Sequence, residues 1–208
     1  MILTGLAPDP RRPDYRLVEV DRGRFASLPA AALTGLDLVV GREIGPLVFE
    51  RLHALADIEA AHRAALRAIA RRAHARVDLR RRLLQKQHPA AAVDPALDRL
   101  SAAGLLNDVQ FAVDYAAAKA RRGRGPARLV RDLQAQGVDR RVAEDAVRSS
   151  LAAEGVDPAD AVRALAEKRA RQLAGLPAAV RKRRLVAFLV RRGFNGGEVR
   201  EVVESLNS

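Results

Sequence analysis

Several residue types that mark common functional classes are missing or scarce in this chain of 208 residues. It has no Cys and no Trp, and Phe and Tyr together number only seven. The lack of Cys excludes disulfides, zinc–thiolate sites and Cys nucleophiles. Because Ala and Leu dominate and aromatic residues are few, the composition favours closely packed helices over a β-sandwich or a β-barrel.

Long apolar runs are absent as well. No stretch of 18 uncharged apolar residues occurs, and the first ten residues lack both a basic segment and an apolar core. The sequence therefore predicts neither a membrane span nor a signal peptide, and we expect a cytoplasmic protein.

Catalytic and metal-binding motifs are equally scarce. The four His show no His-x3-His spacing, so we expect them at the surface or packed in the fold. Gly123 and Gly125 precede Pro126 without a following Gly-Lys-Ser/Thr, which indicates a turn between helices rather than a nucleotide-binding loop. No Ser stands in a Gly-x-Ser-x-Gly setting. We therefore expect no catalytic residue, no cofactor and no metal ion.

What the chain does contain is one pattern that occurs three times. It reads Leu-x3-Leu, then a helix stop four residues later, then a second apolar helix. The copies are Leu79-x3-Leu83 with Gln87, Leu129-x3-Leu133 with Gly137, and Leu185-x3-Leu189 with Gly193. Two Leu one turn apart mark one helix face, and Gly can adopt the left-handed conformation that ends a helix. The pattern predicts tandem helical modules that pack against their neighbours.

Capping residues add a further helix before each copy of the pattern. We predict caps for these helices at Asp57, at Asn107 or Asp108, and at Asp157. Asp139 is expected to cap the helix after the second copy, and Pro126 to lie in the first turn of its helix. Each repeat then contains three helices. We predict the repeats at residues 57–105, 106–155 and 156–208. Phe111 and Tyr115 lie one turn apart and are expected in the core of the second repeat rather than at a stacking site.

Residues 1–56 form a different, β-containing module. Two runs rich in β-forming residues, 15–20 and 24–28, surround Asp21-Arg22-Gly23 and predict a hairpin, after an extended segment at residues 1–13. We also expect a short helix at 29–36, a short strand at 38–41 and a helix at 46–55. The predicted fold class is mainly α: three tandem three-helix repeats preceded by this small module.

The net charge of +12 is unevenly distributed. Residues 1–56 carry seven Arg and seven Asp or Glu, so the whole excess lies on the repeats, which suits a polyanion or an acidic protein surface. A single exposed Arg is more often merely solvated. Three clusters that flank the Leu-x3-Leu helices are the candidate binding surface: Arg71, Arg72, Arg76, Arg80, Arg81, Arg82 and Lys86; Arg121, Arg122, Arg124, Arg128 and Arg131; Arg181, Lys182, Arg183, Arg184, Arg191 and Arg192. Repeats stacked with a constant rotation would join them into one long basic surface.

The order and spacing of several short motifs resemble the RecX regulatory proteins of bacterial recombination. The resemblance covers residues 60–206. The motifs that carry it are Ala65-Leu66-Arg67-x-Ile69-Ala70-Arg71-Arg72, Leu79-Arg-Arg-Arg-Leu83, Leu105-Leu106-Asn107-Asp108-x2-Phe111-Ala112-x2-Tyr115, Leu129-x3-Leu133-x3-Gly137-Val138, and Arg183-Arg184-Leu185-x2-Phe188-Leu189-x-Arg191-Arg192-Gly193-Phe194. Gln87 departs from the family, which usually has Gly at this position.

The resemblance implies an elongated, curved body of three-helix repeats with a basic face. It also implies binding to the RecA recombinase filament and to the backbone of single- and double-stranded DNA. The implied outcome is inhibition of the ATPase, strand-exchange and coprotease activities of RecA in recombination and the SOS response. We expect a monomer. The alternative is a general DNA-binding helical-repeat protein that acts without RecA. A third possibility, a hydrolase with a carboxylate site, has no support in the sequence motifs.

Overall fold

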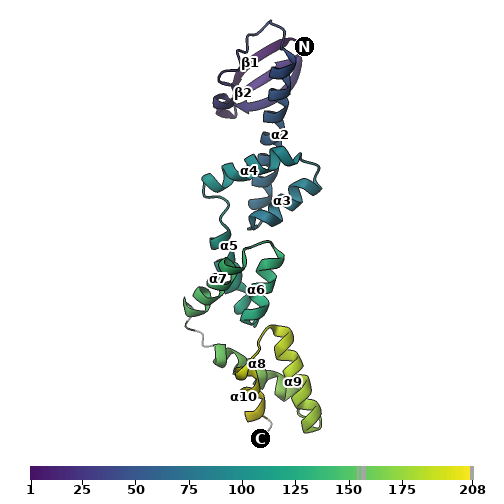
Figure 1. Ribbon diagram of the computed structural model, residues 1–208, viewed down its shortest axis with the longest axis vertical. Helices are drawn as coiled ribbons and strands as arrows, with labels where there is room; N and C mark the ends of the chain where they lie inside the picture. Colours follow the sequence, from purple (N-terminus) through teal and green to yellow (C-terminus); the bar gives the residue numbers. More distant parts are fainter. Residues whose placement is uncertain (154, 156–157, 207–208) are drawn as a thin grey trace. The chain divides into compact units, whose positions relative to one another are not determined.

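The computed structural model describes residues 1–153, 155 and 158–206. The strands are β1 (Leu3–Asp9), β2 (Arg12–Val20) and β3 (Gly23–Pro29). The helices are α1 (Ala30–Leu33), α2 (Pro46–Ile69), α3 (Arg76–Gln85), α4 (Ala90–Ala102), α5 (Asp108–Ala120), α6 (Pro126–Ala135), α7 (Arg140–Ala153), α8 (Pro158–Gln172), α9 (Ala178–Arg192) and α10 (Gly197–Ser205). Figure 1 labels most of them along the chain. The mainly helical fold class with three-helix repeats is confirmed.

The chain divides into two compact units. The first contains Met1–Ala73 and Leu79–Leu106, and the second contains His74–Asp78 and Asn107–Ser208. The first unit thus holds the front module and the first repeat, and the second unit holds the other two repeats. The division of the chain at residues 56, 105 and 155 stays a prediction, although α2 runs through residue 56 without a break.

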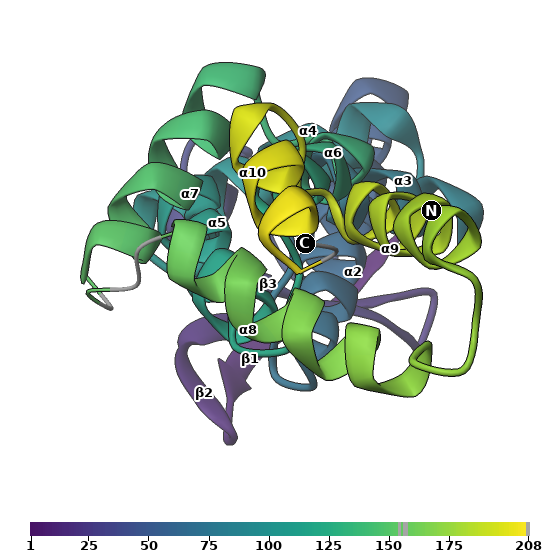
Figure 2. The ribbon, with the colours of Figure 1, turned by 90° about the horizontal axis from the view of Figure 1, so that it is seen from below.

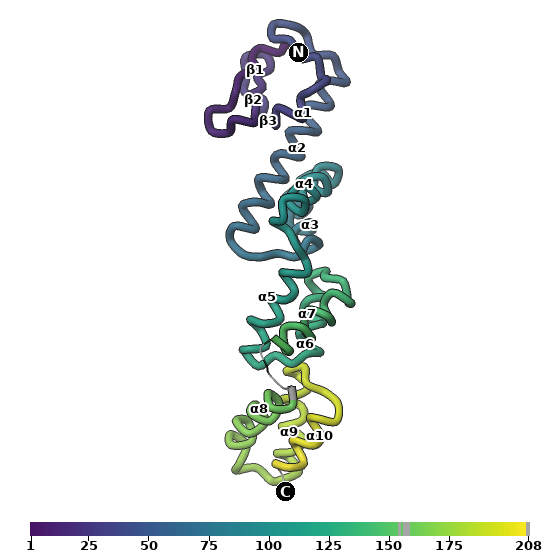
Figure 3. Tube along the Cα trace, turned by 90° about the vertical axis from the view of Figure 1, so that its left-hand side faces the viewer, coloured from purple at the N-terminus to yellow at the C-terminus, as the bar shows by residue number. Residues whose placement is uncertain are grey.

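The front module is a three-stranded antiparallel sheet in the order β1-β2-β3. The predicted hairpin is confirmed as β2 and β3, and β1 is a third strand where only an extended segment was expected. Figure 3 shows the strands beside the first half of α2. Leu3, Val18 and Leu28 of the sheet are buried with Leu52 of α2, so the sheet covers its apolar face with this helix.

Three predictions for the end of the module are wrong. The predicted helix at 29–36 shortens to α1, because Thr34 is extended and Gly35 has a φ of +82°. The predicted strand at 38–41 is not a strand, because Asp37 and Gly41 have left-handed φ values of +44° and +88°. The predicted helix end at 55 and the cap at Asp57 disappear within α2, because this helix contains neither Gly nor an internal Pro.

A buried carboxylate fastens the sheet to the first repeat. The side chain of Glu59, on α2, is only 2% exposed. Its two oxygens accept hydrogen bonds from Arg12 of β2 at 3.0 Å and from Arg99 of α4 at 3.1 Å. The hydroxyl of Tyr15 lies 3.4 Å from the same carboxylate and accepts a hydrogen bond from Arg99 at 3.2 Å. A carboxylate this deeply buried needs such partners.

The repeated pattern forms the cores of the helical repeats. All six Leu of the three Leu-x3-Leu motifs are at most 2% exposed: Leu79, Leu83, Leu129, Leu133, Leu185 and Leu189. Each pair lies in its own apolar cluster, together with residues of the helices before and after it. The helices of the third repeat, α8, α9 and α10, pack against one another in this way (Figure 2). Phe111 is buried as predicted, whereas Tyr115 is half-buried and packs against the same cluster.

The three predicted helix stops share one backbone conformation. The φ angles are +65° at Gln87, +86° at Gly137 and +94° at Gly193. Gln87 therefore ends its helix as the two Gly residues do, but with a side chain in a region that side chains disfavour.

The predicted caps of the second repeat are also confirmed. Asn107 accepts from the N–H groups of Val109 and Gln110, and Asp139 accepts from those of Arg141 and Val142. The predicted cap Asp157 lies outside the described residues.

Candidate interaction surface

The first predicted basic cluster is partly neutralised within its own repeat. Arg80 donates two hydrogen bonds to Asp94, from Nε at 2.8 Å and from Nη2 at 3.1 Å, and this pairing raises the pKa of Arg80. Arg76 is half-buried, and its backbone N–H donates to the carboxylate of Asp108 at 2.7 Å. The other members are exposed: Arg71, Arg72, Arg81, Arg82 and Lys86. This cluster belongs to the first unit apart from Arg76, so the single surface through all three clusters stays a prediction.

The second and third clusters meet within the second unit, around Arg192. This residue lines two open cavities, one of about 580 Å³ and one of about 500 Å³. We call the basic residues of the two cavities the junction surface: Arg121, Arg122, Arg124, Arg128, Arg131, Lys168, Arg169, Arg191 and Arg192. They come from the turn between α5 and α6, from α6, from α8 and from the end of α9. Seven of the nine are residues that the sequence predicted.

Backbone contacts hold the junction surface together. Gly125 donates a backbone hydrogen bond to the carbonyl of Arg192 at 2.8 Å, and Ala127 donates to the carbonyl of Gly193 at 3.2 Å. The guanidinium of Arg192 in turn donates to the carbonyl of Arg122 at 3.1 Å. The end of α9 is therefore fixed against the turn between α5 and α6.

One carboxylate partly balances the α6 side of the surface. Asp132 accepts from Arg128 at 2.9 Å and forms a second ion pair with Arg124. Arg124 also donates to the hydroxyl of Tyr115 at 3.3 Å. Burial, followed by the nearby charge of Asp132, raises the pKa of Tyr115, so this hydroxyl stays neutral. Arg131 donates to the backbone carbonyl of Ala127 in its own helix at 3.3 Å. Because a carbonyl is neutral, this hydrogen bond does not balance the charge of Arg131.

The remaining predicted residues lie elsewhere on α9. Arg181, Lys182, Arg183 and Arg184 occupy the first half of this helix and line neither cavity. Lys182 lies 3.9 Å from the carboxylate of Glu204 on α10, a distance typical of a weak surface pair. The structure thus separates these four residues from Arg191 and Arg192 of the same predicted cluster.

Sequence reasoning missed Lys168 and Arg169. Both lie on α8, which carries no Leu-x3-Leu motif, so they fall outside the clusters predicted beside those motifs. A signal was present: Lys168 and Arg169 follow Leu165 by three and four residues, which puts all three on one helix face. Leu165 lines the larger cavity with them.

The described residues add little that favours other functions. None of their helices is long and apolar enough to cross a membrane. They contain no group of three or more His, Asp or Glu suited to a metal ion. The one buried His, His74, has its Nδ1 atom 2.8 Å from the carboxylate of Asp78, a pair that the sequence analysis did not identify.

Comparison with known proteins identifies the family. Models of the first, second and third three-helix domains of RecX match residues 61–100, 107–147 and 156–203. The chain belongs to the RecX family. Regulatory protein RecX of Halorhodospira halophila is 37% identical over 143 residues, which are 68% of this chain and 85% of that protein. Its counterpart in Mycobacterium ulcerans is 37% identical over 152 residues, 70% of this chain and 83% of that protein.

Solved RecX structures share the fold. A crystal structure of regulatory protein RecX superposes with a TM-score of 0.78 at 18% identity, covering 99% of this chain and all of that one. RecX from Lactobacillus salivarius gives a TM-score of 0.62 at 21% identity, over 73% of this chain and 97% of that one. The first match spans nearly the whole chain, so a RecX fold can include the front sheet as well as the repeats.

Proposed function

We propose that this RecX-family protein is a non-enzymatic regulator of homologous recombination and the SOS response. It binds the RecA–DNA filament and inhibits the ATPase, strand-exchange and coprotease activities of RecA. The observation that carries this proposal is the junction surface, where nine basic side chains from two repeats, Arg192 among them, line two cavities that share Arg192. The family membership supplies the class of partner.

The charge of this surface suits the phosphate backbone of DNA or an acidic face of the recombinase. Asp132 forms ion pairs with Arg124 and Arg128. Contacts of this kind need no base recognition, and the protein then follows the filament without regard to sequence. Each phosphate neutralised by Arg or Lys steepens the loss of affinity with salt. We propose that a monomer makes these contacts in the cytoplasm, with single- or double-stranded DNA.

The test is a measurement of ATP turnover by purified recombinase on single-stranded DNA. This protein, added in substoichiometric amounts at low salt, is expected to lower turnover, and the effect is expected to fade as salt rises. Turnover that stays unchanged at low salt contradicts the proposal.

A second candidate function is general DNA binding without recombinase. The junction surface favours it to the extent that phosphate contacts alone account for binding. This candidate predicts tight, salt-sensitive binding to naked DNA and equal binding to recombinase-coated and naked strands. A clear preference for the coated strand favours the filament regulator.

A further inference from the structure

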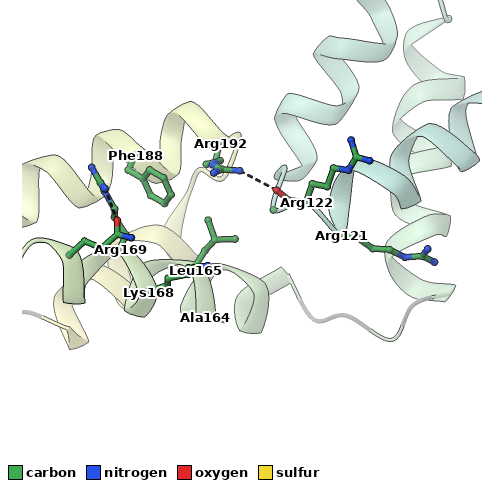
Figure 4. A pocket seen from close by; sticks show the side chains of 10 residues that line it. Arg121, Arg122, Ala164, Leu165, Lys168, Arg169, Phe188 and Arg192 are labelled. Atoms are coloured by element: carbon green, nitrogen blue, oxygen red, sulfur yellow. Dashed lines mark hydrogen bonds between the residues drawn. The ribbon is translucent and has the colours of Figure 1, made fainter.

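The larger cavity of the junction surface is lined by several basic side chains. Among the described residues that line it, Arg121, Arg122, Lys168, Arg169 and Arg192 are basic and none is acidic (Figure 4). Some Arg side chains elsewhere on the repeats are paired with carboxylates, as Arg80 is with Asp94 and Arg140 is with Glu144. The like charges of Arg122, Lys168, Arg169 and Arg192 around one cavity repel one another unless an anion joins them.

Two of these cations are held in place by neutral groups. Arg169 donates to the side-chain carbonyl of Gln172 at 2.7 Å, and Arg192 donates to the backbone carbonyl of Arg122 at 3.1 Å. Both guanidinium groups also lie over the ring of Phe188, at 5.4 Å and 5.3 Å from its centroid. These contacts orient the two guanidiniums without neutralising them, so their charge remains for a ligand.

One donor in the cavity lining lacks an acceptor. The Nε atom of Arg169 is buried and has no hydrogen-bond partner among the described residues. A buried N–H without an acceptor is costly, and a ligand oxygen that reached it would remove this cost.

We infer that this cavity is a binding site for an oligophosphate, a chain of two or more linked phosphate groups. Its volume of about 580 Å³ lies in the range of small-molecule sites, roughly 300–1,000 Å³. Phosphate oxygens match the fork of N–H groups on Arg, and more than one phosphate is needed to balance Arg122, Lys168, Arg169 and Arg192. The phosphates come either from a DNA backbone or from a free oligophosphate such as a nucleoside triphosphate. Leu165 and Phe188 add an apolar wall beside the charges.

The oligophosphate site rests on the proposed function, because its residues belong to the junction surface. Its test nevertheless needs no recombinase. The probe is inorganic tripolyphosphate, titrated into the full-length protein in a calorimeter, with orthophosphate as a comparison. The test variant combines Lys168→Gln with Arg122→Gln, both exposed cavity residues. The control combines Arg171→Gln with Arg200→Gln, which are exposed, lie outside the cavity and remove the same charge.

We expect tripolyphosphate to bind more tightly than orthophosphate. The cavity variant is expected to weaken binding by on the order of tenfold or more, and the control by about twofold or less. Equal weakening in both variants overturns the proposal, because binding then follows net charge alone. The absence of tripolyphosphate binding to the unmodified protein overturns it as well.

A competition experiment distinguishes the two sources of phosphate. If a short oligothymidylate displaces tripolyphosphate, the site takes DNA phosphates, and if both bind together, the site takes a free oligophosphate. Either result supports the site. A protein that binds tripolyphosphate but leaves recombinase turnover unchanged retains the oligophosphate site and loses the proposed function, so the two failures are distinguishable.

Discussion

Gly125 and Gly193 lie so close together that Gly125 has no room for a side chain. A Cβ atom at Gly125 would lie 2.6 Å from the carbonyl carbon of Gly193, and a Cβ atom at Gly193 would overlap Arg128. The second and third repeats are thus joined by backbone packed directly on backbone. This packing sets the position of Arg192 at the centre of the junction surface. The proposed function therefore depends on Gly125 and Gly193.

Substitution of Gly193 by Ala tests this close approach. The left-handed backbone at Gly193 costs an Ala about 1–2 kcal/mol, and the overlap with Arg128 adds about 1–3 kcal/mol. Gly104→Ala is the control. Gly104 also follows a helix and has a positive φ, but the space around its Cβ position is open. Urea unfolding is expected to show a clearly larger loss of stability for Gly193→Ala. Equal losses would mean that the junction yields at little cost.

Gln87→Gly tests the one helix stop that lacks Gly. The φ of +65° costs a side chain about 1–2 kcal/mol, while Gly adds about 0.4–1 kcal/mol of entropy to the unfolded chain. We therefore expect a net gain in stability of about 0.5–1 kcal/mol, measured from the thermal midpoint. Gln136→Gly is the control, since Gln136 has a φ of −88° and is expected to lose up to about 1 kcal/mol. A loss for Gln87→Gly would show that its side chain contributes more than its backbone costs.

Glu59→Gln tests how the front sheet is fastened to the first repeat. The change leaves Arg12 and Arg99 without their shared carboxylate, and breaking such a buried group costs on the order of 3 kcal/mol. Glu50→Gln, on the exposed side of the same helix, is expected to stay within about 0.5 kcal/mol. Urea unfolding followed by circular dichroism measures both. Similar small effects would show that apolar packing alone holds the sheet.

His62 gives the first unit a pH dependence. Burial, and then the charge of Arg99, lower the pKa of His62 below its ordinary value of 6.5. The unfolded chain therefore binds more protons between the two pKa values, and stability falls as pH drops through 6.5 towards the pKa of the folded state. The variant His62→Gln is expected to show a smaller loss of urea midpoint between about pH 7.5 and about pH 5.5. An unchanged loss would assign the pH dependence to other groups.

Local sequence signals predicted most of the fold. The Leu-x3-Leu pairs, the stops at Gly137 and Gly193 and the cap at Asn107 each depend on residues within one or two helical turns, and each is present in the structure. The prediction failed at Asp57, where a cap signal lay inside an uninterrupted helix. It also missed the third strand β1, whose pairing depends on contacts between separate segments.

The candidate site was predicted only in part, for a related reason. Sequence reasoning grouped Arg residues by their neighbours along the chain, which joined Arg181 to Arg192 although the two lie at opposite ends of α9. The junction surface depends on pairs such as Arg122 and Arg192, which are 70 residues apart. Glu59 likewise binds Arg12 and Arg99, which are 47 and 40 positions away in the sequence. No periodicity of a single helix encodes such contacts.

The most direct test of the central claim compares the unmodified protein with Arg131→Glu/Arg191→Glu in the recombinase assay. Both residues are exposed and line the smaller cavity of the junction surface, so the fold is expected to change little in stability. At low salt and substoichiometric amounts, the unmodified protein is predicted to lower ATP turnover by recombinase on single-stranded DNA, and the double variant to lower it far less. Equal inhibition by a folded double variant would contradict the role of the junction surface, and no inhibition by the unmodified protein would contradict the function itself.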